Sequence, residues 1–235
     1  MNRDVIDWNA IENFIGYGNP KAAVVFIGLE EGLDSEESLE KELQLRSTFA
    51  PVVDVEQAFE GAPWQRKLFD PEHTVSQRTW RPMCDLMLRR GGDPAPTLAQ
   101  RNHYQATRLG RTGGDTLLAE LLPYPNVSVA SWPYEKYGRF KSREDYADAL
   151  IGSRIKLLRD AIAHPVRQLV VCYGKGQWDN YKKLFPDVRW RTEGAFETGT
   201  SNGTRIVLTP HFSQREFNTD LQLADFAKIA LASTP

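Results

Sequence analysis

Four short apolar runs, each bounded by polar or turn-forming residues, predict buried β-strands. Continuous apolar runs of this length are typical of strands that are covered on both faces. These runs are residues 22–28, 126–132, 168–173 and 204–209. Apolar positions at helical spacing lie around them and predict helices at residues 5–15, 76–90, 114–122, 142–163, 177–184 and 220–231.

Strands that alternate with helices favour a parallel sheet with helices on both faces. We therefore expect an α/β protein, a three-layer α/β/α sandwich around a central, mostly parallel four-stranded sheet. In such sheets, functional sites lie outside the carboxyl ends of the strands. The residues that follow each predicted strand are thus the first place to look for chemistry.

Two segments interrupt the alternation. Residues 33–113 form an insertion far longer than an ordinary crossover, broken by several prolines, and long excursions of this kind are typical of lids or binding elements. Residues 192–203 are rich in Gly, Thr and Ser, which predicts a turn or hairpin before the last strand. The whole chain, residues 1–235, is expected to be a single domain that includes the insertion.

Composition narrows the class of protein. The 235 residues are 41% hydrophobic and 26% charged, as in average globular proteins, and no apolar run approaches the length of a membrane span. The first residues lack the pattern of a signal peptide, so we expect a cytoplasmic protein without a membrane partner. Two cysteines, Cys84 and Cys172, are too few for a disulfide framework, a four-thiolate zinc site or an iron–sulfur cluster. We expect no metal and no cofactor.

Charge is spread unevenly along the chain. The net charge is −2, but residues 30–60 carry −8 and residues 64–143 carry +6. The basic segment interleaves cations with aromatic residues, a mixture that suits binding to a phosphate backbone and stacking on bases. An ordinary solvated surface over a core of aromatics would produce the same pattern. The residues concerned are Trp64, Arg66, Lys67, Trp80, Arg81, Arg101, Tyr104, Arg108 and Arg111.

Two predicted turns at the carboxyl edge carry candidate catalytic groups. The first strand ends in Gly28-Leu29-Glu30-Glu31-Gly32, where glycines let the backbone approach a ligand and two carboxylates follow. The last strand leads to His211, which can donate a hydrogen bond to developing negative charge. Each has a structural alternative, because the glutamates suit a helix N-terminus and a lone histidine is often structural.

Together these turns resemble the two signature motifs of the uracil-DNA glycosylase superfamily. There, a strand ending in Ile-Gly leads into an acidic turn, and a later strand leads into His-Pro-Ser and a DNA-penetrating loop. In this chain the motifs are residues 25–32 and His211-Phe212-Ser213, and residues 117–125 lie where the family reads the base. The chain departs from the family at three positions: Glu31 replaces the turn's usual proline, Phe212 replaces the proline of His-Pro-Ser, and Glu120 replaces the base-reading asparagine. Without the four cysteines of the cluster-bearing branches, it looks like a divergent, cluster-free member.

The resemblance implies a role for each residue. Glu30 would activate water or stabilise the sugar cation, with Glu31 as its competitor, and His211 would bind the base carbonyl. Gly28 and Leu29 would present backbone to the base, and Glu120 would read its edge. The segment from Phe212 to residue 218 would enter the DNA, and Lys175 and Ser213 would hold phosphates. The wedge that fills the place of the flipped nucleotide would be one of Gln214, Arg215 and Phe217.

The sequence therefore predicts a monomeric DNA glycosylase that flips a base out of DNA and leaves an abasic site. A carboxylate at residue 120 would repel uracil and accept from the amino group of cytosine, which favours a 5-substituted cytosine as the substrate. Such bases occur in phage genomes, so a defence role fits. Three alternatives stay open: a uracil glycosylase in repair, a non-catalytic nucleic-acid sensor of the same fold, and a different α/β hydrolase or nucleoside-processing enzyme.

Overall fold

A single mixed sheet of eight strands forms the centre of the computed structural model, which describes residues 6–33, 35–60, 65–128 and 130–232. The strands are Gly16–Gly18 (β1), Val24–Gly28 (β2), Val52–Val53 (β3), Thr116–Glu120 (β4), Leu169–Tyr173 (β5), Arg191–Glu193 (β6), Phe196–Ser201 (β7) and Thr204–Thr209 (β8). Their order across the sheet is β3-β1-β4-β2-β5-β8-β7-β6.

The four central strands β4, β2, β5 and β8 are all parallel, which confirms the predicted α/β class and parallel core. The expected strand number was wrong, because the sheet continues on both sides. Strand β1 adds antiparallel to β4 and carries β3, whereas β7 and β6 add antiparallel beyond β8. The predicted hairpin is confirmed: β6 and β7 fall within or beside residues 192–203, and Asn202 and Gly203 take the positive φ of a two-residue turn into β8.

One of the four predicted strands was placed on the wrong residues. Residues 126–128 and 130–132 belong to no named strand, and the strand is Thr116–Glu120, within the segment predicted as a helix at 114–122. A short apolar run such as Leu117-Leu118-Ala119 fits either element, and only its neighbours decide. Here β2 on one side and β1 on the other take up its backbone hydrogen bonds. The shift puts Glu120 at the carboxyl end of a strand.

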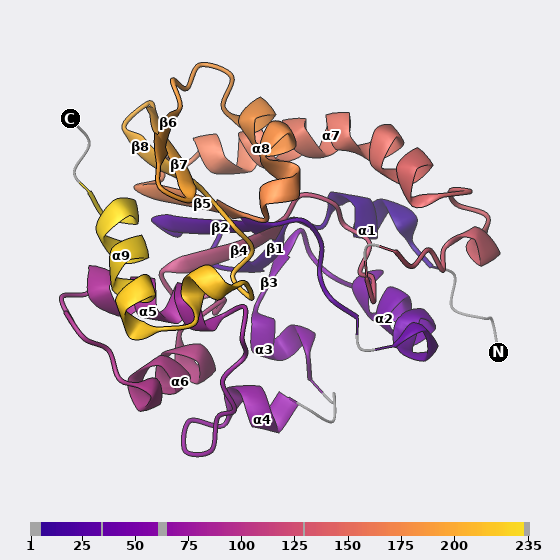
Figure 1. The fold of residues 1–235 in the computed structure, drawn as a ribbon. Helices are drawn as coiled ribbons and strands as arrows, with labels where there is room; N and C mark the ends of the chain where they lie inside the picture. The colour runs from indigo at the N-terminus through magenta and orange to yellow at the C-terminus, as the bar shows by residue number, and fades with distance from the viewer. Residues whose placement is uncertain (1–5, 34, 61–64, 129, 233–235) are drawn as a thin grey trace.

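Helices cover both faces of the sheet (Figure 1). They are Trp8–Asn13 (α1), Leu39–Arg46 (α2), Val55–Ala58 (α3), Gln65–Phe69 (α4), Arg81–Arg90 (α5), Leu98–Thr107 (α6), Arg143–Ala163 (α7), Trp178–Leu184 (α8) and Asp220–Ala230 (α9), with short 3-10 turns at Glu36–Ser38, Glu135–Tyr137, Lys175–Gln177 and Arg215–Phe217. No helix among the residues just described combines the length and the apolar character needed to cross a membrane.

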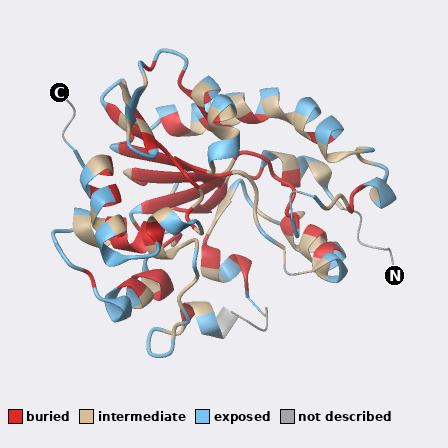
Figure 2. Cartoon of the chain, in the orientation of Figure 1, coloured by how far each residue is buried: buried red, intermediate tan, exposed pale blue. Residues whose placement is uncertain are grey.

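Side chains of the central strands alternate between two cores. Val24 and Phe26 of β2 face the core that α5, α6 and α9 cover, and Val25 and Ile27 face the core under α7 and α8. Every residue of β2 and β5 is buried, as Figure 2 shows for the middle of the sheet. This double burial explains why these strands appear in the sequence as unbroken apolar runs.

The long insertion is part of this architecture. Its helix α5 supplies Met83 and Leu86 to the first core, and α6 supplies Tyr104. Its strand β3 extends the sheet beside β1. Its helix α2 supplies Leu39 and Leu43 to the second core, so the segment contributes to both faces of the sheet.

A buried arginine ties helix α7 to the carboxyl side of the sheet. The Arg154 guanidinium is 1% exposed and donates to four carbonyl oxygens, those of Glu12, Phe14, Glu120 and Leu121, at 2.6–3.2 Å. Burial lowers its pKa to about 10, so the group stays charged at neutral pH. These bonds satisfy the carbonyls where β4 ends, and they fix the backbone of Glu120.

Replacing this arginine should therefore destabilise the protein. In Arg154→Met the side chain still fills space, but four carbonyl oxygens lose their donor, and we expect the free energy of unfolding to fall by about 3 kcal/mol or more. Urea unfolding followed by circular dichroism measures the change. Arg159→Met, at an exposed position of the same helix, is the matched control and should change stability by less than about 0.5 kcal/mol. A loss below about 1 kcal/mol in the Arg154 variant would contradict this role.

Candidate active site

Three glutamates meet at the carboxyl edge of the parallel strands. Gly28 and Glu120 are register partners at the ends of β2 and β4. Beyond them the two chains stay paired, since the amides of Leu121 and Leu122 donate to the carbonyls of Gly28 and Leu29 at 2.9 and 2.7 Å. This continued pairing carries the Glu30-Glu31 turn alongside the end of β4. The structure thus brings together the acidic residues that the sequence predicted from two separate segments.

Glu31 lies in a buried hydrogen-bond network. Its Oε2 accepts from the Tyr17 hydroxyl and from Arg46, which is 1% exposed. Arg46 also donates to the Tyr17 hydroxyl at 3.0 Å and to Glu42 at 2.8 Å. Burial raises the pKa of Glu31, and the charge of Arg46 opposes this shift. The network fixes the orientation of the carboxylate, and Oε2 already accepts two hydrogen bonds.

Glu30 has a different partner. Its Oε1 accepts from Arg143 at 2.6 Å, and its side chain is 8% exposed. Arg143 is the first residue of α7, where the helix dipole disfavours a cation, so this arginine gains its stabilisation from Glu30. Burial raises the pKa of Glu30, whereas the hydrogen bond and charge of Arg143 lower it. The second oxygen, Oε2, is buried and has no hydrogen-bond partner among the described residues.

Glu120 and Tyr173 converge over Gly28. A side-chain carbon at residue 28 would collide with the Tyr173 hydroxyl and with Oε2 of Glu120, so only glycine leaves room for both groups. Oε2 of Glu120 is buried without a hydrogen-bond partner in the described part of the chain. Burial raises the pKa of Glu120 well above its usual range, and the charges of Glu31 and Glu30 raise it further. The protonated acid is therefore favoured at this position.

His211 is oriented by the residue that was expected to hold a phosphate. The backbone N–H of Ser213 donates to Nδ1 of His211 at 3.2 Å, and the Ser213 hydroxyl lies 2.8 Å from the same atom. A ring nitrogen that accepts carries no proton, so the proton of the neutral ring is on Nε2. Burial lowers the pKa of His211. The result is a neutral imidazole whose Nε2–H is a donor.

Tyr173 connects the histidine to the glutamates. It ends β5, the strand between β2 and β8, and its ring centroid lies 5.5 Å from that of His211. Its hydroxyl reaches the group of atoms around Gly28. The acidic turn and the histidine therefore border one continuous patch of the sheet edge.

Two of the predicted DNA-contacting residues belong to the core instead. Phe212 is 1% exposed and stacks on Tyr173, with ring centroids 4.8 Å apart, and Phe217 is 2% exposed and packs edge-on against Phe212. Both rings also contact Phe226 of α9. Their burial does not fit the role of a DNA wedge, because an apolar ring at this sheet edge is drawn into the core that α9 closes. The exposed candidates for the wedge are Gln214 and Arg215, and the Arg215 side chain is 90% exposed.

The remaining predicted residues have simpler surroundings. Leu29 packs against the core under α7, and its carbonyl already accepts from Leu122, so little of it is left to face a base. Lys175 is exposed just before α8, with its ammonium group 5.5 Å from the ring centroid of Trp178. Its contact with a phosphate stays a prediction.

Most arginines of the basic segment are engaged in ion pairs. Arg101 contacts Asp85 and Asp220, and Arg111 contacts Asp54 and Glu56. Trp80 packs against the core, and Tyr104 is buried in it. The regular interleaving of cations and aromatics thus reflects core packing and ion pairing on α5 and α6. Trp64 lies outside the described residues, as does the side chain of Arg66.

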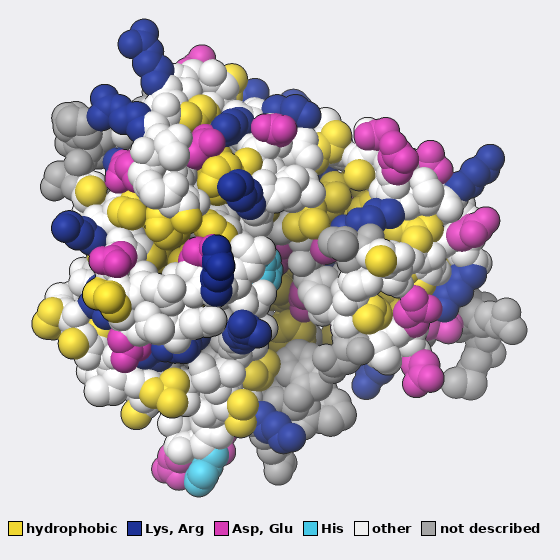
Figure 3. Space-filling model, in the orientation of Figure 1, with side chains coloured by type: hydrophobic (Ala, Val, Ile, Leu, Met, Phe, Trp, Pro, Cys, Tyr) yellow, Lys and Arg dark blue, Asp and Glu magenta, His cyan; other side chains and the backbone are white. Residues whose placement is uncertain are grey.

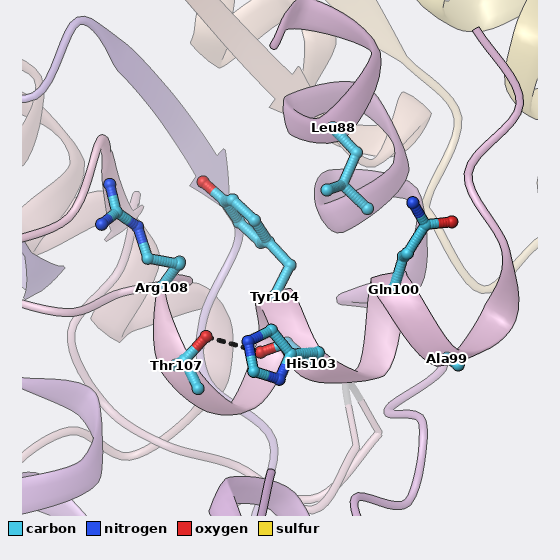
Figure 4. Close-up of a pocket in the computed structure, with 7 residues that line it drawn as sticks. All are labelled: Leu88, Ala99, Gln100, His103, Tyr104, Thr107 and Arg108. Carbon is cyan, nitrogen blue, oxygen red and sulfur yellow. Dashed lines mark hydrogen bonds between the residues drawn. The ribbon is translucent and has the colours of Figure 1, made fainter. Parts of the chain in front are cut away.

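The surface around the site is hollowed. Figure 3 shows a narrow depression near the middle of one face, with a histidine and acidic side chains inside it and Lys and Arg side chains around it. A separate apolar hollow lies between α5 and α6, where Leu88, His103 and Tyr104 line it (Figure 4). None of the three glutamates lines this second hollow.

Four residues of the site were not predicted from the sequence: Tyr17, Arg46, Arg143 and Tyr173. Only Arg46 gave a signal, as one of two cations in a stretch with a net charge of −8. The others come from elements far apart in the chain, and their partners are set by the fold.

The tautomer of His211 can be tested directly. Because Nδ1 accepts from the Ser213 amide and burial disfavours the cation, we expect a neutral ring with Nε2–H at pH 7 that gains a second proton only below the ordinary pKa of about 6.5. Long-range ¹⁵N–¹H correlation spectra of the imidazole report both. Ser213→Ala keeps the amide donor and should keep the tautomer. A proton on Nδ1 at pH 7 would contradict the geometry.

No group of three or more His, Cys, Asp or Glu side chains in the described ranges is arranged to hold a metal ion. The reactive groups described at this sheet edge are carboxyl groups, a phenol and an imidazole. Comparison of the chain with models of known protein families and with curated proteins finds no match.

Proposed function

We propose that this protein is a DNA glycosylase, an enzyme that removes a flipped base by hydrolysing its N-glycosidic bond. The observation that carries the proposal is the meeting, at one sheet edge, of a neutral histidine donor with carboxyl groups whose second oxygens have no hydrogen-bond partner among the described residues. These oxygens are Oε2 of Glu30 and Oε2 of Glu120. Each part of the reaction has a group suited to it.

Hydrolysis of the bond passes through a sugar with oxocarbenium character, which a nearby carboxylate stabilises and a water attacks. Glu30 suits both tasks, because Arg143 occupies only Oε1 and leaves Oε2 to accept a proton from water. Glu31, whose Oε2 is held by Tyr17 and Arg46, suits a fixed negative charge. These contacts favour Glu30 over Glu31 as the base in the proposed reaction.

As the glycosidic bond breaks, its electron pair moves toward the base, and the carbonyl oxygen of the base becomes more negative. A preorganised donor stabilises it most when the donor is neutral and already oriented. The Nε2–H of His211 meets this description, since Ser213 fixes the ring and burial keeps it uncharged. This supports the role of base-carbonyl donor that the resemblance implies for His211.

A polyanionic substrate also fits the surroundings. Lys and Arg side chains border the depression (Figure 3), and Lys175 and Arg215 are exposed near the ends of β5 and β8. Cations around an acidic interior would hold phosphates at the rim and leave the carboxyl groups for the flipped nucleotide. The net charge of −2 therefore does not oppose DNA binding.

Loss of the proposed base should stop the reaction without loss of DNA binding. For Glu30→Gln we expect the single-turnover rate of base release to fall by about 10²–10⁴-fold, because glutamine cannot accept the proton of water. The measurement is the formation of abasic sites in duplexes that carry uracil, cytosine or 5-hydroxymethylcytosine at one position. Affinity for the same duplexes should change less than about threefold, since phosphate contacts supply most of it.

Glu37→Gln is the matched control, because this exposed glutamate lies on the same connection after β2. It should leave base release unchanged. A wild-type protein that binds DNA but releases no base from any of the duplexes would overturn the proposal and favour a non-catalytic sensor.

A further inference from the structure

The unpartnered oxygen of Glu120 is the least explained feature of the site. The side chain ends β4, its Oε2 is buried without a hydrogen-bond partner in the described part of the chain, and it lies over the Cα of Gly28 together with the Tyr173 hydroxyl. Leaving a buried carboxyl oxygen without a hydrogen bond costs free energy unless a ligand or a proton satisfies it. The arrangement is that of a site completed by its substrate.

We infer that Glu120 is the general acid of the reaction and that the excised base is a cytosine-type base, whose ring nitrogen takes the proton of Glu120 as the glycosidic bond breaks. This inference rests on the proposed function and extends it to the leaving group. It gives Glu120 a catalytic role in addition to the base-reading role that the sequence suggested.

The charges that face Glu120 come from every side of the site. Glu30 and Glu31 follow β2, Arg46 belongs to α2, Arg154 belongs to α7, and the Tyr173 hydroxyl approaches from β5. Arg46 is engaged with Glu31 and Glu42, and Arg154 with four carbonyls, so neither forms an ion pair with Glu120. Burial and the two neighbouring glutamates raise its pKa, which favours the protonated acid.

If Glu120 is protonated, repulsion of uracil by a carboxylate no longer explains why a cytosine-type base is preferred. A bare carboxylate would repel uracil, but a carboxylic acid has one donor and one acceptor and can pair with the edge of either pyrimidine. The choice between the two bases then depends on which of them can accept the proton of Glu120. Cytosine presents a basic ring nitrogen beside its amino group, whereas uracil has an N–H at that position and offers the acid only a weakly basic carbonyl oxygen.

The step balances without another reactant. The O–H proton of Glu120 moves to the ring nitrogen N3, the electron pair of the C1′–N1 bond moves onto the base, and the base leaves uncharged. Water adds to C1′ and gives its proton to Glu30, and one proton returns from Glu30 to Glu120 through solvent. The sum is the N-glycoside and water going to the free base and the abasic sugar. Cytosine needs this acid more than uracil does, because its anion is the poorer leaving group.

Two carboxyl groups in different surroundings thus take opposite roles. Glu30 has a cationic partner and accepts a proton. Glu120 has no ion pair with any described residue, faces two acids and donates a proton. Environments that separate the pKa values of two carboxyl groups are a known way to assign acid and base in one site. The assignment can be tested with a variant that keeps the hydrogen bond but has no proton to transfer.

The experiment compares Glu120→Gln with wild type in single-turnover base release between pH 5 and 9. The substrates are duplexes with 5-hydroxymethylcytosine, cytosine or uracil at one position. For wild type we expect release of the cytosine-type bases to slow as pH rises and Glu120 loses its proton. In Glu120→Gln we expect release of these bases to be at least about 100-fold slower, with that pH dependence gone. Glu37→Gln should match wild type throughout.

A second measurement does not depend on turnover. The infrared difference spectrum of wild type minus Glu120→Gln at pH 7 should contain a carboxylic-acid C=O band that disappears as pH rises. Absence of this band would overturn the general-acid role even if the Gln variant loses activity through misfolding.

The outcomes separate the two proposals. If no duplex loses a base, the proposed function fails. If bases are released but uracil is preferred, or if Glu120→Gln releases cytosine-type bases at the wild-type rate, the glycosylase proposal stands and the general-acid inference is overturned. Slow release of cytosine-type bases by the variant together with the carboxylic-acid band supports it.

Discussion

Burial of three carboxyl groups at one sheet edge is the constraint on which the site depends. An isolated buried carboxylate is unstable, so each group needs a cation, a set of donors or a proton. Glu31 has Arg46 and Tyr17, and Glu30 has Arg143. Glu120 has no ion-pair partner among the described residues, and burial raises its pKa well above the usual range. Three similar side chains thus have three different sets of partners.

The same requirement shapes the surrounding fold. Arg46 lies in the last turn of α2, and Arg143 begins α7, so the two arginines fix the ends of helices that flank the acidic turn. Arg154, also on α7, holds the carbonyl of Glu120. Helix α7 therefore supports both the acid and the base of the proposed reaction. Because Gly28 has no side chain, Glu120 and Tyr173 can both approach the end of β2.

Apolar and polar side chains divide the loop after β8 between core and site. Phe212 fills the space under Tyr173 and contacts α9, whereas His211 and Ser213 on either side of it form a hydrogen-bonded pair at the sheet edge. The ring of Phe212 thus fixes the backbone that orients the imidazole. Phe212 therefore has a structural role, although its place in the motif suggested contact with DNA.

The sequence by itself determined the α/β class, three of the four central parallel strands, and the turns that carry Glu30, Glu31 and His211, because fully buried strands appear as continuous apolar runs and sites follow their carboxyl ends. Tertiary structure decided the rest. Whether Leu117-Leu118-Ala119 forms a helix or a strand depends on strands that are far away in the chain and take up its hydrogen bonds. The partners of the glutamates could not be predicted from local sequence patterns either. The side chains concerned come from distant elements and meet the acidic residues only after the sheet has formed: Tyr17, Arg46, Arg143 and Tyr173.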